Sequence, residues 1–165
     1  MIINPQAKAG AAKKKISIIK RLLDSEKIKP SYYKTRSVGD EINIVKRAVE
    51  DGFRKFICVG GDGTIQKIIA GIQIQKVCDP KEVVVGIVPL GTGNDWAKSI
   101  EVPLNIKKAI KKIKEGKTKK RDLGVVVIRG KKKIKKRYFI SYSGVGFDAF
   151  MLNRLQPYKW LGKYA

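Results

Sequence analysis

Two patterns of hydrophobic and polar residues alternate through residue 116. Short apolar runs, typical of buried strands, are separated by segments in which apolar residues recur every three or four positions, as on one face of a helix. The predicted strands are residues 1–3, 30–35, 55–60 and 82–91. The predicted helices have apolar faces within 16–23, 42–49, 65–72 and 106–113, and a short helix is predicted to begin at Asn94.

This alternation predicts an α/β fold, with a mostly parallel sheet and helices on both of its faces. The run 82–91 is apolar almost throughout, which indicates a strand buried on both faces. In sheets of this kind ligands bind beyond the carboxyl ends of the strands. We therefore expect functional residues in the loops that follow the strands.

The pattern changes after residue 122. Two β runs, 125–129 and 137–142, are joined by a lysine-rich turn. We predict an α/β domain at 1–124 and, at 125–165, the beginning of a β-rich second domain that is too short to bury a core of its own. An unpaired hairpin edge of this kind would allow a homodimer.

Composition adds a strong positive charge. Among 165 residues, 43% are hydrophobic, which is typical of a globular chain, and 37 Lys and Arg face 14 Asp and Glu, for a net charge of +23. Such a surface attracts anionic lipid, nucleotides or nucleic acid. The lysines of 107–114 also fit the solvated face of an amphipathic helix, an interpretation that we favour, and the stretch "KKKIKKR" at 131–137 fits either role.

The absence of histidine excludes Ser-His-Asp and Cys-His catalysis within this chain, and any histidine metal site. Cys58 and Cys78 have no metal-ligand spacing, and Cys58 lies in an apolar run that indicates a small core residue. We find no signal-peptide pattern and no apolar run of about 18 residues or more. A cytoplasmic protein, or one held on a membrane surface without spanning it, is expected.

Two glycine turns each follow a predicted strand and open a helix: "GGDGT" at 60–64 and "PLGTGND" at 89–95. Glycine lets a ligand approach the backbone closely, and a helix N-terminus offers free N–H donors to phosphate. The two turns therefore predict a phosphate site. Asp62 would repel phosphates unless Mg²⁺ intervenes, and its alternative role is the N-cap of a helix beginning at Thr64.

At these residues the chain resembles the diacylglycerol kinase catalytic domain family, which includes bacterial lipid kinases and sphingosine and ceramide kinases. "GGDGT" followed by "PLGTGND" carries the resemblance, with "NPQAKAG" at 4–10, "RDLG" at 121–124 and "SGVGFDA" at 143–149 in the same order. "GGDGT" alone is shared with NAD kinases, whereas its combination with "PLGTGND" is specific.

The resemblance implies a two-domain enzyme that transfers the γ-phosphate of ATP to a lipid hydroxyl such as that of diacylglycerol. ATP and Mg²⁺ would be its cofactors. Its partners would be the lipid substrate and an anionic membrane surface, and no nucleic-acid partner is expected. The implied metal candidates are Asp62 and Asp95. The implied nucleotide-binding residues are Asn4, Thr35, Gly60, Gly61, Asp62, Gly63, Thr64, Gly91, Thr92, Gly93 and Asn94.

The chain also departs from the family's pattern. The family's general base lies in a carboxy-terminal region near an Asp-Gly-Glu motif, and no such motif follows Ala149. No catalytic residue is therefore assigned to this chain, and we expect weak nucleotide binding with little or no lipid turnover. Two alternatives remain: an NAD kinase, which leaves "PLGTGND" unexplained, and a basic nucleic-acid-binding module, which leaves the paired glycine turns unexplained.

Overall fold

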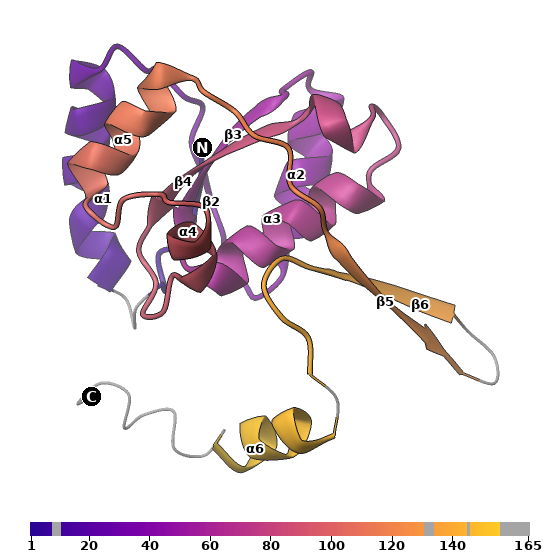
Figure 1. The fold of residues 1–165 in the computed structure, drawn as a ribbon. Helices are drawn as coiled ribbons and strands as arrows, with labels where there is room; N and C mark the ends of the chain where they lie inside the picture. The colour runs from indigo at the N-terminus through magenta and orange to yellow at the C-terminus, as the bar shows by residue number, and fades with distance from the viewer. Residues whose placement is uncertain (8–10, 131–133, 145, 156–165) are drawn as a thin grey trace.

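A four-stranded parallel sheet forms the centre of the molecule (Figure 1). The computed structural model describes residues 1–7, 11–130, 134–144 and 146–155. The strands lie in the order β2-β1-β3-β4 and comprise β1 Ile2–Ile3, β2 Tyr33–Lys34, β3 Lys55–Gly60 and β4 Val84–Pro89. All three pairings are parallel, which confirms the predicted α/β sheet.

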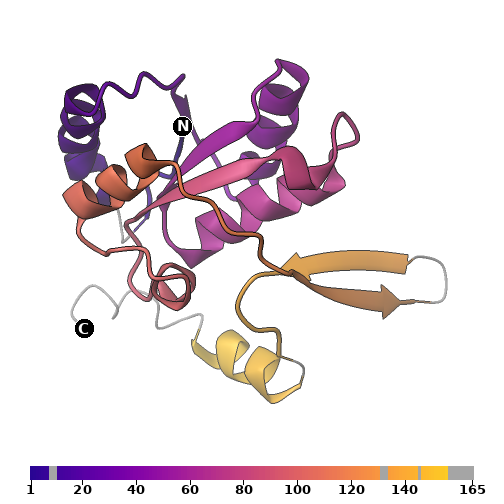
Figure 2. The ribbon, with the colours of Figure 1, turned by 45° about the horizontal axis from the view of Figure 1, so that its top comes forward.

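Helices cover both faces of this sheet, as predicted (Figure 2). One face carries α1 (Ala11–Ser25) and α5 (Ile106–Glu115), and the other carries α2 (Asp40–Glu50) and α3 (Asp62–Ile74). The short helix α4 (Asp95–Ser99) begins next to Asn94, where the sequence predicted it.

Alternation along β3 divides the core into two layers. Phe56 and Cys58 pack toward α2 and α3, whereas Ile57 and Val59 pack toward α1 and α5, because successive side chains of a strand point to opposite faces. Cys58 is fully buried, as expected of a core residue. Burial, followed by the charges of Glu41 and Asp62, raises the pKa of its thiol and keeps the thiol protonated.

Helix α5 shows how strictly its polar and apolar sides are separated. The Asn105 side chain accepts a hydrogen bond from the Lys108 N–H (3.1 Å), and Gly116, at φ +69°, ends the helix in the left-handed region. Ala109 and Ile110 are buried while most of the lysines of 107–114 are exposed, as an amphipathic helix requires, and this exposure fits both a solvated face and one that contacts anionic lipid. No helix within the described residues is long and apolar enough to cross a membrane.

Two predicted strands were too long. The run 30–35 contributes only β2, because its partner β1 has two residues to pair with. The run 82–91 forms β4 from Val84, after a 3-10 turn at Pro80–Glu82. The expectation that this strand is buried on both faces is wrong for its first half, since β4 is an edge strand and Val84 is 37% exposed.

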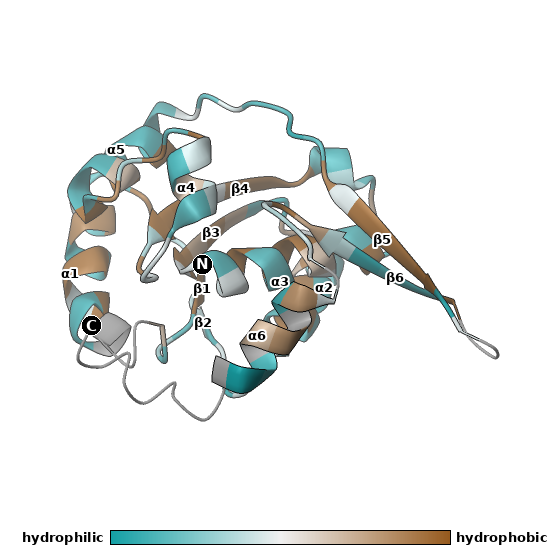
Figure 3. Ribbon diagram, turned by 60° about the horizontal axis from the view of Figure 1, so that its bottom comes forward, coloured by the Kyte–Doolittle hydropathy of each residue, from teal (hydrophilic) through white to brown (hydrophobic). Residues whose placement is uncertain are grey.

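The predicted β-rich segment is an antiparallel hairpin of β5 (Gly124–Arg129) and β6 (Ile134–Phe139). The second run, predicted at 137–142, was placed three residues too late, because pairing with β5 draws the lysine-rich residues 135–136 into the strand. Residues 131–133 of the turn lie outside the described residues. Figure 3 shows β5 as largely hydrophobic and β6 as largely hydrophilic. Helix α6 (Phe147–Leu155), which was not predicted, follows the hairpin.

Gln66 of α3 joins the hairpin to the α/β body. Its Nε2 donates a hydrogen bond to the Tyr138 carbonyl, and its Oε1 accepts one from the Ile140 N–H (3.2 Å). Ile140 is buried in the same core layer as α2 and α3. The helix that begins in the first glycine turn therefore also holds the end of β6.

Candidate functional site

The strand order places a switch point between β1 and β3. The chain leaves β1 toward β2 on one side and then returns to β3 on the other, and such a reversal opens a crevice at the carboxyl ends of the two strands. The predicted nucleotide-binding residues gather at this edge: Asn4 follows β1, Thr35 follows β2, Gly60 ends β3 and 61–64 follow it, and 91–94 follow β4.

The two glycine turns are in direct contact. The Leu90 N–H donates a hydrogen bond to the Gly60 carbonyl (2.8 Å). A Cβ built on Gly61 would lie 2.7 Å from the Gly91 Cα, and a Cβ built on Gly91 would lie 2.6 Å from the Gly61 Cα. Side chains at these positions would force the turns apart, so glycine is required here by backbone-to-backbone packing.

Asn94 shapes the second turn. It adopts the left-handed conformation (φ +52°) and is 8% exposed. Its Oδ1 accepts a hydrogen bond from the Gly91 N–H (2.7 Å), and its Nδ2 donates one to the Gly91 carbonyl (2.8 Å). Because both ends of this amide are occupied within the turn, its principal role in the structure is to hold the loop.

Asn4 and Thr64 link β1 to the first turn. The Asn4 Nδ2 donates a hydrogen bond to the Thr64 Oγ1 (3.1 Å), and its backbone N–H donates to the Val59 carbonyl (3.1 Å). Thr64 is 3% exposed, and a Cβ on Gly60 would lie 2.6 Å from its hydroxyl. Gly63 and Thr92, in contrast, are exposed at the surface of the two turns.

Asp62 connects the first turn to the second. Its Oδ1 accepts a hydrogen bond from the Trp96 N–H (3.0 Å) and its Oδ2 accepts one from the Asp95 N–H (3.2 Å). The N-cap role in its own helix is wrong: α3 begins at Asp62 itself, after Gly61, and the carboxylate reaches α4 instead. The carboxylate thereby satisfies N–H groups that α4 leaves free at its N-terminus.

The carboxylates of Asp62 and Asp95 both lie next to Gly93, near the point where a side chain would begin. A Cβ on Gly93 would be 3.0 Å from the Asp95 Oδ2 and 3.4 Å from the Asp62 Oδ2. Asp95 is exposed and forms an ion pair only with Lys98 (3.3 Å) within the described residues. That part of the chain contains no cluster of three potential metal ligands. Two carboxylates suit Mg²⁺ that takes its other ligands from phosphates and water.

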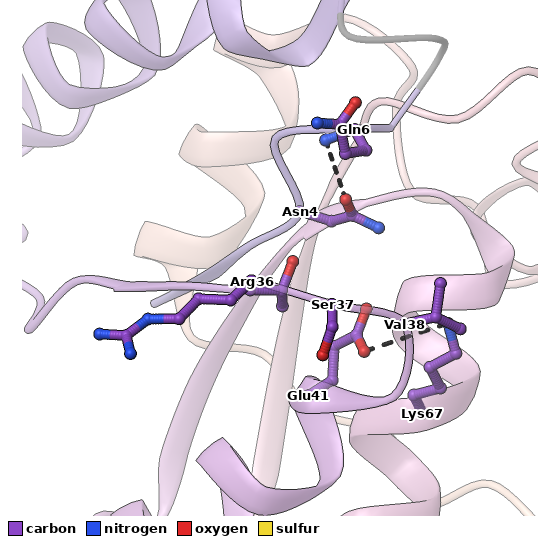
Figure 4. A pocket seen from close by; sticks show the side chains of 8 residues that line it. Asn4, Gln6, Arg36, Ser37, Val38, Glu41 and Lys67 are labelled. Carbon is purple, nitrogen blue, oxygen red and sulfur yellow. Dashed lines mark hydrogen bonds and ion pairs between the residues drawn. The ribbon is translucent and has the colours of Figure 1, made fainter.

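A pocket of about 230 Å³ lies beside the first turn (Figure 4). It contains two residues of the predicted site, Asn4 and Thr35, and two that the sequence analysis missed, Glu41 and Lys67. Glu41 stands one helical turn before the apolar residues at 44–45 and therefore on the buried face of α2, a placement that the sequence pattern already contained. The remaining lining residues are Gln6, Arg36, Ser37 and Val38.

Comparison with known proteins agrees with this geometry. The model of the family described as "Diacylglycerol kinase catalytic domain" matches residues 1–126. The chain belongs to this family. Family membership confirms the resemblance. Membership in a kinase family also implies the use of ATP.

Individual members of the diacylglycerol kinase family cover most of the chain. A diacylglycerol kinase of Staphylococcus carnosus (strain TM300) is 30% identical over 146 residues, which are 88% of this chain and 44% of that protein. A diacylglycerol kinase of Staphylococcus epidermidis (strain ATCC 35984) is 34% identical over 116 residues, which are 70% of this chain and 33% of that protein. A crystal structure of a diacylglycerol kinase from Bacillus anthracis str. Sterne aligns at 26% identity with a TM-score of 0.60, covering 70% of this chain and 42% of that one. The chain spans less than half the length of these relatives.

Proposed function

We propose that this chain is the nucleotide-binding half of a lipid kinase that transfers the γ-phosphate of ATP to a lipid hydroxyl such as that of diacylglycerol. The contact between the two glycine turns, at the ends of β3 and β4 and next to the switch point between β1 and β3, carries the proposal. Gly63 and Thr92 are exposed, and these small residues would let phosphate groups approach the N-terminal end of α3.

Mg²⁺ would be held between Asp62 and Asp95, where it supplies charge neutralisation to the phosphates. Phosphoryl transfer depends mainly on positioning and electrostatics, and the turns and the two carboxylates are suited to both. No general base is assigned among the described residues. We propose that residues beyond this chain supply it, so the chain alone would turn over little or no lipid.

Titration of the purified chain with ATP and Mg²⁺ tests the proposal. We expect saturable, weak binding that falls severalfold in Asp95→Ala and in EDTA, because the metal bridge to the phosphates is lost. Asp24→Ala, which removes an exposed carboxylate of α1, is the matched control and should bind as the parent chain does. Diacylglycerol phosphorylation, measured in the same preparation, should stay near background.

Absence of ATP binding by the folded chain would contradict the nucleotide site. Rapid phosphorylation of diacylglycerol would contradict the assignment of the general base to another part of the protein. If neither EDTA nor Asp95→Ala changed the affinity for ATP, the proposed role of Mg²⁺ would be contradicted, and the glycine turns alone would form the phosphate site.

We further propose that the lysines of α5 hold the protein against anionic lipid. Lys107 and Lys111 are exposed one helical turn apart, so both project from the same side of α5. Each cation near an anionic surface contributes about 1 kcal/mol, so replacing both with glutamine should weaken binding to phosphatidylglycerol vesicles by about 30-fold.

The control removes the same charge elsewhere. Lys76→Gln with Lys81→Gln removes two exposed cations that precede β4, at a distance along the chain from α5. Vesicle co-sedimentation in low salt should separate the two double variants. Equal losses in both would show that net charge alone drives binding, and no loss in either would leave the α5 lysines as a solvated face only.

A further inference from the structure

The pocket beside the first glycine turn contains a buried carboxylate oxygen that has no hydrogen-bond partner among the described residues. Glu41 is 1% exposed, and its Oε2 accepts no hydrogen bond from any described residue. The Lys67 Nζ lies 4.0 Å away, which is an ion-pair distance but too long for a hydrogen bond. Figure 4 shows the Glu41 carboxylate turned toward the pocket, with Lys67 beside it and the Arg36 guanidinium directed away.

A carboxylate in this position restricts what the pocket can hold. An ionised carboxylate only accepts hydrogen bonds, and leaving a buried acceptor unsatisfied costs free energy. A phosphate placed against it would add a second negative charge and no donor. The part of a ligand that fits here must therefore carry no negative charge and must offer an N–H or O–H donor.

Asn4 connects the pocket to the proposed phosphate site. Asn4 lines the pocket, and the same side chain donates to Thr64 in the first glycine turn. Lys67 is on α3, one turn after Thr64. A nucleotide bound with its phosphates at the glycine turns would thus extend its uncharged nucleoside end toward Glu41.

We propose that Glu41 is a specificity-determining residue that accepts a hydrogen bond from an N–H or O–H donor of the nucleoside and so fixes the direction in which the nucleotide binds. The donor is the amino group of the base or a ribose hydroxyl. This inference rests on the proposed function and adds to it a recognition residue that neither glycine turn contains.

Nucleotide analogues identify the donor. Calorimetric titrations would compare ATP with purine riboside triphosphate, which lacks the amino group, and with 2′-deoxy-ATP and 3′-deoxy-ATP. We expect the parent chain to bind at least one analogue about tenfold more weakly than ATP, and Glu41→Ala to bind ATP and that analogue equally. Glu41→Gln, whose amide oxygen still accepts a hydrogen bond, should retain part of the preference. Glu50→Ala, an exposed glutamate on the same helix, is the control.

A second measurement needs no variant. Amide NMR shifts should change at Gly61 and Gly91 with either ATP or inorganic tripolyphosphate, whereas those of Ser37 and Val38, which line the pocket, should change with ATP only. Equal shifts at Ser37 and Val38 with tripolyphosphate, or an unaltered analogue preference in Glu41→Ala, would overturn the inference while ATP binding, and with it the proposed function, stands. Failure of ATP itself to bind the folded chain would instead overturn the proposed function.

Discussion

Gly91→Ala is expected to lower the free energy of unfolding by about 3 kcal/mol or more and to abolish ATP binding. The added methyl group would lie 2.6 Å from the Gly61 Cα and 2.7 Å from the Asn94 Oδ1. Neither neighbour yields easily, because the first is backbone and the second is held by two hydrogen bonds to Gly91 itself. Overpacking in such a setting costs about 1–3 kcal/mol, and separation of the turns would add to it.

Gly63→Ala is the matched control for stability. A Cβ at Gly63 meets no other atom within 4 Å, and the residue lies in the first turn of α3. Alanine is favoured over glycine in a helix by up to about 1 kcal/mol, so this variant should be as stable as the parent chain or more so. Urea unfolding monitored by circular dichroism compares the two. Equal midpoints for Gly91→Ala and the parent chain would contradict the direct contact of the turns.

Local patterns were sufficient for the elements that build this site. The apolar face of α2 and the apolar run of β3 depend on residues that are neighbours in sequence, so periodicity predicted both. The glycine turns were also visible, because each stands between a strand pattern and a helix pattern. From the sequence, the glycines were explained by the close approach of a ligand to the backbone. The structure adds a second reason for glycine at Gly61 and Gly91, because the two turns pack directly against each other there.

Pairings between distant residues were not predictable in the same way. The Asp62 carboxylate accepts hydrogen bonds from N–H groups that lie 33 and 34 positions later in the sequence. The Gln66 side chain forms hydrogen bonds with the backbone 72 and 74 positions later. Nothing in the local pattern specifies such partners. The hairpin register is a related case, since the lysine-rich run resembles a turn until pairing with β5 is known. Glu41 shows a third limit: its buried position was predictable from helical spacing, but the pocket in front of it was not.

The second large effect is expected for Asp62→Ala, which should lower the free energy of unfolding by about 3 kcal/mol even in EDTA. Each charge-assisted hydrogen bond contributes about 1.5–3 kcal/mol, and the half-buried setting of Asp62 reduces the sum of two. Removal of the carboxylate would leave the N–H groups of Asp95 and Trp96 without their acceptor and would loosen α4 from the first turn.

Asp95→Ala separates this structural role from metal binding. The Asp95 carboxylate is exposed and pairs only with Lys98 among the described residues, and such a surface pair contributes at most about 1 kcal/mol. Without metal, Asp95→Ala should therefore unfold close to the parent chain while Asp62→Ala unfolds much earlier. With ATP and Mg²⁺ present, both variants should lose the stabilisation that ligand binding gives the parent chain. If the two variants were equally stable in EDTA, the carboxylate of Asp62 would serve the metal alone, and the link between the glycine turns would depend on Gly61, Gly91 and Asn94.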